Sequence, residues 1–311
     1  MNSREDWDSN EKMDPIQKNN EEISKILSGF LPKEKNLETQ VPGLTLFRID
    51  HSFVRVPLTY HPRIILMAQG KKRVFIGEDT YSYDPTQYLV LSVPIPLECD
   101  AVADVNKPIL GFGIEVDPAE VAEILLLTEE TKYTGENLPK GIYGASVTEE
   151  ISDASLRLIQ TLGSKADSLV LGKSIVREII YRVLTGENGE ALQALAHRNR
   201  KFFQISQILT RIHKEYDQNL DIGELAMACG MSVSTFHVCF KAVTNSSPLQ
   251  YIKSVRLQKA RSLMITEGTN AITAAERVGY ESPSQFSREY KRYFGLSPAK
   301  DQTQQLLAVE N

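Results

Sequence analysis

A short pattern occurs twice near the end of this 311-residue chain. The stretch SVSTFHVCFKAVTNSSP covers residues 232–248, and SPSQFSREYKRYFGLSP covers residues 282–298. Each copy begins with a serine that can cap a helix and has a phenylalanine at its fifth position. Each ends in Ser-Pro, which can cap and open a further helix. The repeat therefore predicts two copies of one short helical unit in the last third of the chain.

The residues before each copy extend the repeat. They are a helix-capping Asp or Asn, a small alanine and a glycine, namely Asp221, Ala226 and Gly230, and Asn270, Ala275 and Gly279. The alanine allows two helices to cross closely, and the glycine can take the positive φ that ends a helix. This order predicts helix-turn-helix units at 222–243 and 271–294, in which the second helix enters a DNA major groove.

The segment between the two units predicts a connecting helix from Pro248 to about Ile265. Such a helix would span about 27 Å, close to the roughly 34 Å that separates successive major-groove segments on one face of a duplex. The two units would then allow one chain to read both segments of double-stranded DNA.

In the N-terminal part the apolar residues follow a different spacing. Between Gly43 and Asp117, short apolar runs alternate with Gly, Pro and Asp turn signals, which is typical of an antiparallel sandwich or barrel. We expect an α+β two-domain chain with a cupin-like or jelly-roll-like β-barrel and a C-terminal all-α double helix-turn-helix. The expected segments are an acidic tail and short helix at 1–36, the barrel at 37–117, a helical linker or dimerisation segment at 118–198, the DNA-binding domain at 203–301 and a tail at 302–311.

Charge and composition restrict the class of protein. Residues 200–311 hold 14 Lys and Arg against 10 Asp and Glu, whereas residues 1–199 hold 21 against 30. A basic end on an acidic body fits an anionic partner such as DNA.

No apolar run reaches the roughly 20 residues of a membrane span and no signal peptide is present, so we expect a cytoplasmic protein with no membrane partner. The three cysteines form no CxxC pair, which predicts neither a disulfide framework nor a metal site, and no cofactor is expected.

Two long stretches resemble a known family. GMSVSTFHVCFKAVTNSSPLQYIKSVRLQKAR and VGYESPSQFSREYKRYFGLSP resemble the DNA-binding domain of AraC/XylS-type transcription regulators over about Phe203 to Asp301. YHPRIILMAQGKKRVFIGEDTYSYDPTQYLVLSVPIPLECDA resembles the N-terminal cupin-like domain of one AraC-type subgroup. The resemblance implies a regulator that activates or represses promoters, in many members with a small effector in the barrel, a homodimer and, for an activator, contact with RNA polymerase.

The outward, N-terminal face of each second helix is predicted to contact DNA. In the second unit these residues are Ser282, Ser284, Gln285, Ser287 and Arg288, with Lys291 and Arg292 for phosphates. In the first unit they are Ser232, Ser234, Thr235, His237 and Val238, with Lys241 for phosphate. Arg288 is the best candidate for reading a base, since a guanidinium can bind guanine through two hydrogen bonds. The alternatives are an ion pair of Arg288 with Glu281 and a solvated His237.

The first unit departs from the resemblance at Val238, where the repeat and many relatives carry an arginine. Valine can contact a thymine methyl group but cannot donate a hydrogen bond. We therefore predict that the second unit dominates recognition.

Several other polar and sulfur-containing residues could have either a functional or a structural role. Cys99 could react with an electrophilic effector or simply pack in a strand, and Cys229 and Cys239 fit a helical core. Lys71, Lys72 and Arg73 follow Gly70 and are interpreted as a solvated hairpin tip rather than a DNA patch. His51 and His61 lack the spacing of a metal-binding cupin.

Two other functions remain open from the sequence. One is a cupin-type enzyme with a DNA-binding tail, and the other is a regulator whose barrel only dimerises. The sequence does not specify the effector, the operator or the target genes. It also leaves open whether the regulator activates or represses, its oligomeric state and which residues line the pocket.

Overall fold

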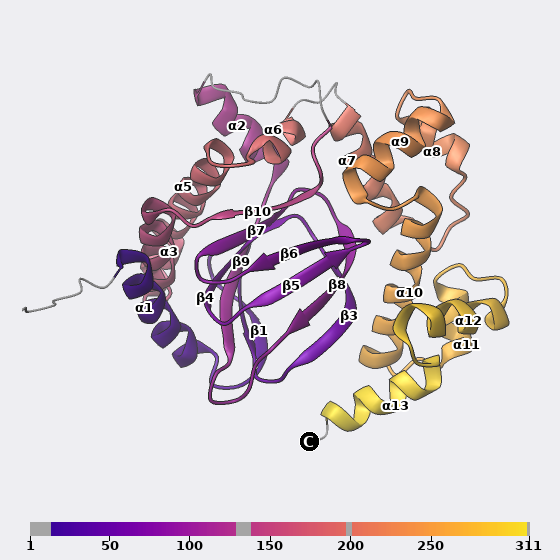
Figure 1. Cartoon of the computed structure of the whole chain (residues 1–311), viewed down its shortest axis with the longest axis horizontal. Helices are drawn as coiled ribbons and strands as arrows, with labels where there is room; N and C mark the ends of the chain where they lie inside the picture. The colour runs from indigo at the N-terminus through magenta and orange to yellow at the C-terminus, as the bar shows by residue number, and fades with distance from the viewer. Residues whose placement is uncertain (1–13, 129–137, 197–200, 310–311) are drawn as a thin grey trace, which may run out of the picture.

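The computed structural model describes residues 14–128, 138–196 and 201–309. A β-sandwich occupies the centre, with one group of helices on one side and the C-terminal helices on the other (Figure 1). The predicted two-domain α+β layout is thus confirmed. Residues 1–13 of the segment that was predicted as an acidic tail and short helix lie outside the described residues.

The described strands form two antiparallel sheets. The larger has the order β1 (Lys35–Glu38), β2 (Leu44–Ile49), β9 (Ile109–Glu115), β4 (Arg63–Gln69), β7 (Gln87–Leu91) and β10 (Ile142–Ser146). The smaller has the order β3 (Phe53–Tyr60), β8 (Ile95–Ala101), β5 (Lys72–Ile76) and β6 (Asp79–Tyr83). Within the described ranges no strand pair joins the two sheets, so the predicted strands stack as an open sandwich and do not close into a barrel.

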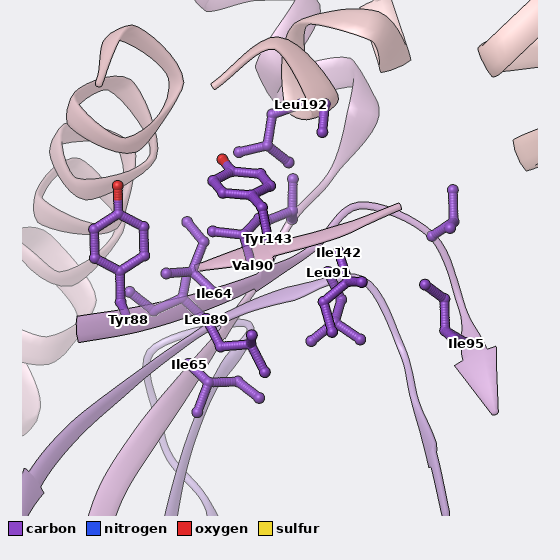
Figure 2. Packing of buried hydrophobic residues seen from close by; sticks show 14 of the residues in the cluster. Ile64, Ile65, Tyr88, Leu89, Val90, Leu91, Ile95, Ile142, Tyr143 and Leu192 are labelled. Atoms are coloured by element: carbon purple, nitrogen blue, oxygen red, sulfur yellow. The ribbon is translucent and has the colours of Figure 1, made fainter. Parts of the chain in front are cut away.

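Strand β10 lies inside the segment 118–198 that the sequence indicated as helical. It pairs with β7 from Ile142 opposite Leu91 to Ser146 opposite Gln87. Figure 2 shows Ile142 and Tyr143 among the buried side chains of β7, with Leu192 packed above them. A five-residue strand with a distant partner leaves little signal, because so short an apolar run fits a helix as well.

Helices α1 (Pro15–Phe30), α3 (Glu149–Thr161) and α5 (Gly172–Thr185) cover the outer face of the larger sheet (Figure 1). The Asp14 carboxylate caps α1, and Pro15 opens it. Asn19 joins α1 to α3 through bonds to Ser152 (3.1 Å) and Asp153 (2.7 Å). The remaining helices of this part are α2 (Pro118–Thr128), α4 (Lys165–Val170) and α6 (Glu190–Ala196).

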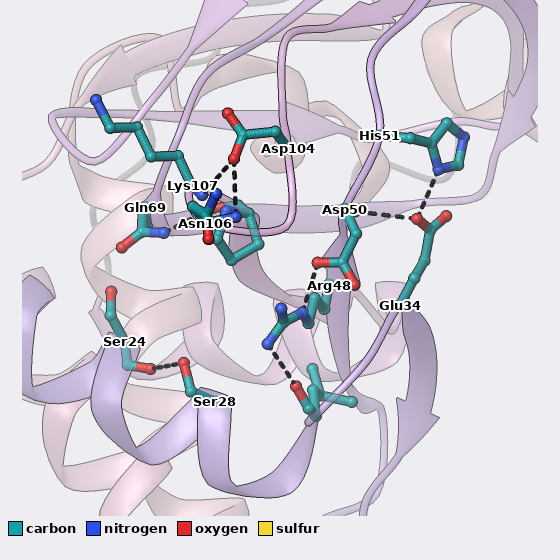
Figure 3. Close-up of polar contacts among 12 residues, drawn as sticks. Ser24, Ser28, Glu34, Arg48, Asp50, His51, Gln69, Asp104, Asn106 and Lys107 are labelled. Carbon is teal, nitrogen blue, oxygen red and sulfur yellow. Dashed lines mark hydrogen bonds and ion pairs between the residues drawn. The ribbon is translucent and has the colours of Figure 1, made fainter.

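Polar contacts fix the rim of the sandwich near the end of α1 (Figure 3). Arg48 donates to Asp50 at 2.6 Å and to the carbonyl oxygen of Leu31 at 3.1 Å. The Asp104 carboxylate accepts from the backbone N–H groups of Asn106 and Lys107 and closes the turn between β8 and β9. The Arg48 bonds join the end of α1 to β2, and the Asp104 bonds stabilise the turn itself.

The C-terminal part consists of short helices, as predicted. They are α7 (Lys201–Lys214), α8 (Ile222–Ala228), α9 (Val233–Thr244), α10 (Pro248–Thr266), α11 (Ala271–Arg277), α12 (Pro283–Phe294) and α13 (Pro298–Val309). The predicted caps all accept a backbone bond, namely Asp221, Ser232, Ser247, Asn270 and Ser282. Helix α13 extends into the segment 302–311 that was predicted as a tail. The side chain of Gln302 attaches it to the end of α10, since it donates to the carbonyl oxygens of Met264 and Thr269.

No single described helix has the length and hydropathy of a membrane span. Helices α8 and α9, which meet at 83°, pass that test only when they are taken together, and both belong to the first helix-turn-helix unit.

The two helix-turn-helix units belong to different hydrophobic cores. The core of the first unit, which includes Phe236, Phe240 and Tyr251, is continuous with the core of the sandwich. The second unit has a core of its own, which includes Met264, Ala275 and Phe286. The first unit is therefore built onto the N-terminal domain, whereas the second is a separate small body at the far end of α10.

The glycine in the turn of each unit allows a direct comparison. Gly230 and Gly279 have φ of +64° and +81°. A Cβ at Gly230 meets nothing within 4 Å, whereas one at Gly279 lies 2.4 Å from the Asp217 carbonyl oxygen. We expect Gly230→Ala to lower the free energy of unfolding by about 1 kcal/mol, from the left-handed backbone alone. Gly279→Ala is expected to cost distinctly more, and equal losses in urea unfolding would contradict this account.

Candidate nucleic-acid interface and internal cavity

The residues predicted to contact DNA lie on the outward faces of α9 and α12. On α9, Ser232, Ser234, His237, Val238 and Lys241 are exposed and Thr235 is partly exposed. On α12, Ser284, Gln285, Ser287, Arg288, Lys291 and Arg292 are exposed and Ser282 is partly exposed. The opposite faces of both helices are buried through Phe236, Phe240, Phe286 and Tyr290. Each helix therefore presents its predicted reading face to solvent.

The two capping serines are engaged within their own helices. The Ser232 hydroxyl accepts from the backbone N–H of Thr235 and lies 2.9 Å from the Thr235 hydroxyl. The Ser282 hydroxyl accepts from the backbone N–H of Gln285 at 3.3 Å. Their position at the N-terminus of each reading helix thus has a structural cause in addition to the predicted contact with DNA.

Arg288 is free of partners within the described ranges. The ion pair with Glu281 that the sequence allowed does not form. By contrast, Glu289 accepts bonds from Lys253 (2.7 Å), Tyr280 (2.9 Å) and Gln285 (3.2 Å). Burial acts to raise the pKa of Glu289, but these three donors outweigh it and hold the pKa below its ordinary value. Gln285 is therefore engaged in the free protein, whereas the guanidinium of Arg288 is available.

Val238 is 71% exposed, so its methyl groups stand on the outward face of α9. Cys229 and Cys239 are buried, as the helical pattern indicated. Burial, with a smaller contribution from Cys239, raises the pKa of Cys229 to about 11. Both thiols therefore belong to the core of the first unit.

Hydrogen bonds attach the first unit to the sandwich at three places. Asn245, which ends α9 in the left-handed conformation, donates to the carbonyl oxygen of Ile76 at 2.8 Å. The backbone N–H of Gly141 donates to the carbonyl oxygen of Val243 at 2.9 Å. The Tyr251 hydroxyl donates to the carbonyl oxygen of Pro94 at 2.6 Å. Sequence reasoning missed this seam, because each bond joins residues far apart along the chain.

Two histidines meet beside this seam. The Nε2 atom of His213 lies 2.9 Å from the Tyr251 hydroxyl, and the rings of His61 and His213 are 5.7 Å apart. Since Tyr251 donates its proton to Pro94, the Nε2–H of His213 donates to Tyr251, which leaves Nδ1 as a bare, buried acceptor. Burial, then His61 and Lys259, lowers the pKa of His213 to about 4. Among the described residues, no group of three or more His, Cys, Asp and Glu side chains could hold a metal ion.

A cavity of about 680 Å³ lies between the inner faces of the two sheets. Its wall includes Phe47 of β2, Arg63 of β4, Leu58 and Tyr60 of β3 and Gly113 of β9. The missing side chain at Gly113 leaves room beside Arg63, whose Nε is buried without a hydrogen-bond partner among the described residues. The C-terminal part contributes Arg261 of α10 to the same wall. The cavity therefore contacts both parts of the chain.

Lys72 is a cavity residue and not part of a solvated hairpin tip. Its side chain is only 7% exposed, and its Nζ donates to the Tyr60 hydroxyl at 2.8 Å. The rings of Phe47, Tyr60 and Tyr83 surround the ammonium group at 5.6 to 6.0 Å. No carboxylate pairs with Lys72 within the ranges that the structure covers.

The error in placing Lys72 has a simple cause. Strand β5 begins at this residue, so the alternation of the strand turns Lys72 inward. Lys71 is exposed, and Arg73 pairs with Asp100 on the outer face at 2.6 Å.

The surroundings of Cys99 favour packing in a strand over reaction with an electrophilic effector. Its thiol is fully buried and donates to the backbone oxygen of Asp100. Burial raises the pKa of Cys99 and disfavours the reactive thiolate. Cys99 is also not among the residues that line the cavity. These observations favour packing in strand β8.

Comparison with known proteins agrees with the two halves of the structure. Residues 40–191 match the family described as the AraC-type transcriptional regulator N-terminus, and residues 225–304 match a helix-turn-helix domain. The probable transcriptional regulator LumQ of Photobacterium leiognathi is 22% identical over 86% of this chain and 98% of its own length. The chain belongs to the AraC/XylS family of transcriptional regulators.

Other relatives match over a shorter stretch of the chain. The transcriptional regulator AlkR of Acinetobacter baylyi is 35% identical over 30% of this chain and 31% of its own length. The Msm operon regulatory protein of Streptococcus mutans is 29% identical over 31% of this chain and 34% of its own. The chain thus aligns with about a third of the length of these two regulators.

A solved structure is similar in fold to most of the chain. ToxT from Vibrio cholerae covers 84% of this chain and 96% of its own with a TM-score of 0.53 and 11% identity. At that identity the likeness concerns the fold alone.

The lowered pKa of His213 predicts a pH dependence of stability. The unfolded chain takes up this proton near the ordinary value of 6.5 and the folded chain only near about 4, so stability falls as the pH falls through this window. We expect the free energy of unfolding to fall between pH 7 and pH 4.5 by roughly 2 kcal/mol more in the wild type than in His213→Gln. Urea unfolding at both pH values measures this difference, and parallel losses would contradict the assignment.

Proposed function

We propose that the protein binds promoter DNA with α9 and α12 in successive major-groove segments and thereby regulates transcription. The observation that supports this best is the outward face of α12, where Arg288, Lys291 and Arg292 are exposed without partners among the described residues. Ser284, Gln285 and Ser287 lie on the same face. Arg288 reads a base and the other two cations bind phosphates.

The second unit dominates recognition in this proposal. The outward face of α9 offers Ser234, Thr235, His237 and Lys241, but its central position carries Val238. The exposed methyl groups of Val238 contact a thymine methyl group or sense the shape of the groove. The first half-site is therefore read with less discrimination than the second.

Two substitutions test this ranking. Arg288→Ala is expected to weaken binding of the natural operator by about 10-fold to 100-fold, because a two-bond contact with guanine supplies about 1–3 kcal/mol. Val238→Ala is expected to weaken it less than Arg288→Ala does. Arg157→Ala, which removes an exposed arginine of α3 that pairs with Glu178, is the control for loss of charge. A larger effect of Val238→Ala in a gel-shift titration would reverse the ranking.

We further propose that the cavity between the sheets binds a small effector with an acidic group. A buried ammonium group without a carboxylate partner is costly, and an anionic ligand would supply the missing charge. The cavity volume of about 680 Å³ suits a ligand of drug-like size. ToxT structures of similar fold have been solved with an unsaturated fatty acid and with (E)-4-(8-methylnaphthalen-1-yl)but-3-enoic acid, both of which are carboxylic acids.

The structure offers one surface for a homodimer, which we propose as the second partner of the chain. Leu169 and Val170 on α4 and Leu171 after it are 60%, 73% and 48% exposed, and they lie in the segment that the sequence indicated for dimerisation. If the protein is an activator, RNA polymerase is a third partner. No observation favours the enzyme alternative.

Matched acids and amides test the effector site. At millimolar concentration, octanoate and benzoate are expected to raise the melting temperature of the wild type more than octanamide and benzamide do. Lys72→Met is expected to abolish this difference and to raise the stability of the ligand-free protein by about 1 kcal/mol or more, since it removes a buried charge. Equal shifts from both members of each pair would overturn the anionic assignment and leave the DNA-binding proposal intact.

A further inference from the structure

Two residues of α10 lie between the cavity of the N-terminal domain and the second reading helix. Gln258 and Arg261 are three positions apart, so they lie on the same face of α10. Gln258 bonds to the sandwich and to α12, whereas Arg261 lines the cavity and binds α13. No prediction from the sequence assigned either residue a role.

The first route passes through Gln258. Leu58 and Tyr60 of β3 line the cavity, and Thr59 between them points to the opposite side of the strand. The Thr59 hydroxyl donates to the Gln258 side-chain oxygen, and the Gln258 amide donates to the Tyr293 hydroxyl at 2.9 Å. Three side chains therefore link the cavity strand β3 to α12.

The second route passes through Arg261, which is itself part of the cavity wall. Its guanidinium binds Asp301 of α13 through two bonds of 2.7 Å and 3.1 Å and lies 5.1 Å from the ring centre of Phe294. The same carboxylate, which is 3% exposed, accepts from the Tyr290 hydroxyl of α12 at 2.6 Å. Two-bond pairs of this kind restrict orientation as well as distance.

The first unit is attached differently. Its bonds to the sandwich involve Pro94, Ile76, Asp79 and Gly141, none of which lines the cavity between the sheets. Its core is also continuous with that of the sandwich, whereas the second unit has a separate core. Polar side chains therefore connect the cavity wall directly to α12. The first unit, by contrast, shares one core with the sandwich and has no such polar connection to the cavity among the described residues.

We propose that Gln258 and Arg261 are positioning residues that transmit occupancy of the cavity to α12. An effector that moves β3 or engages Arg261 shifts the second reading helix relative to the first. The inference rests on the proposed effector site and adds to it which half of the DNA site responds.

Linkage makes this testable before the effector is known. If occupancy of the cavity alters the affinity of α12 for DNA, then binding of DNA must alter the affinity of the cavity for its effector by the same factor. We therefore expect binding of DNA to shift the conformation of the cavity wall even when no effector is present. Strand β3 carries both the cavity residues and Thr59, so its backbone amides report the coupling.

The experiment is hydrogen–deuterium exchange on the full chain, free and bound to a duplex that the wild type selects from a random pool. We expect peptides that cover residues 53–60 to change their exchange rate at least threefold on DNA binding. Gln258→Leu and Arg261→Lys are each expected to reduce this response while the duplex still binds. Ser262→Ala, an exposed neighbour on α10 whose side chain takes no part in either route, is the control and is expected to respond as the wild type does.

The outcomes separate this inference from the function on which it rests. A wild type that binds its duplex with no change in β3 overturns the coupling and leaves DNA recognition intact. A wild type that selects no duplex overturns the proposed function itself. If Arg261→Lys does not fold, Gln258→Leu, which leaves the pair of Arg261 with Asp301 in place, tests the route through Gln258, and the milder Asp301→Asn tests the route through Arg261. An undiminished response in Gln258→Leu refutes the first route.

Discussion

Helix α10 is the support on which both reading helices depend. Its 19 residues take part in two cores, with Tyr251, Ile252 and Val255 in the core of the first unit and Leu257, Ala260 and Met264 in that of the second. A helix of this length spans about 28 Å, and its continuous backbone bonds make it a stiff spacer. The distance between α9 and α12 therefore follows from α10, while their relative orientation depends on what packs at each of its ends.

The two ends of α10 meet different surroundings. At the N-terminal end, Tyr251 is bonded to Pro94 and to His213, so the first unit shares the stability of the sandwich. At the other end the second unit packs as a small separate body. It meets the N-terminal domain where α12 approaches β3, through the bond of Gln258 to Thr59 and at the cavity wall that includes Arg261. Small packed bodies attached by a few polar bonds are the parts of a protein that reorient most easily. This difference is a physical basis for control of DNA recognition by a ligand that binds elsewhere.

The interior of the sandwich also favours control by a bound ligand. A domain selected only for stability would fill the space between its sheets with apolar side chains, yet here Lys72 and the unpaired Nε of Arg63 face a cavity beside Gly113. A buried ammonium group such as that of Lys72, which has a hydroxyl but no carboxylate partner among the described residues, is costly and marks a candidate binding site. These residues were not identified from the sequence, since whether Lys72 points inward depends on the residue at which β5 begins.

What the sequence by itself determined was local. Serine caps, turn glycines and buried Phe and Tyr positions specify the two helix-turn-helix units, because the bonds involved join residues a few positions apart. The tertiary structure alone decided the pairing of β10 with β7, the seam at Asn245, the inward position of Lys72 and the bonds of Gln258 and Arg261. Those contacts join residues distant along the chain, and which of them form depends on how whole elements pack, which no short stretch of residues specifies.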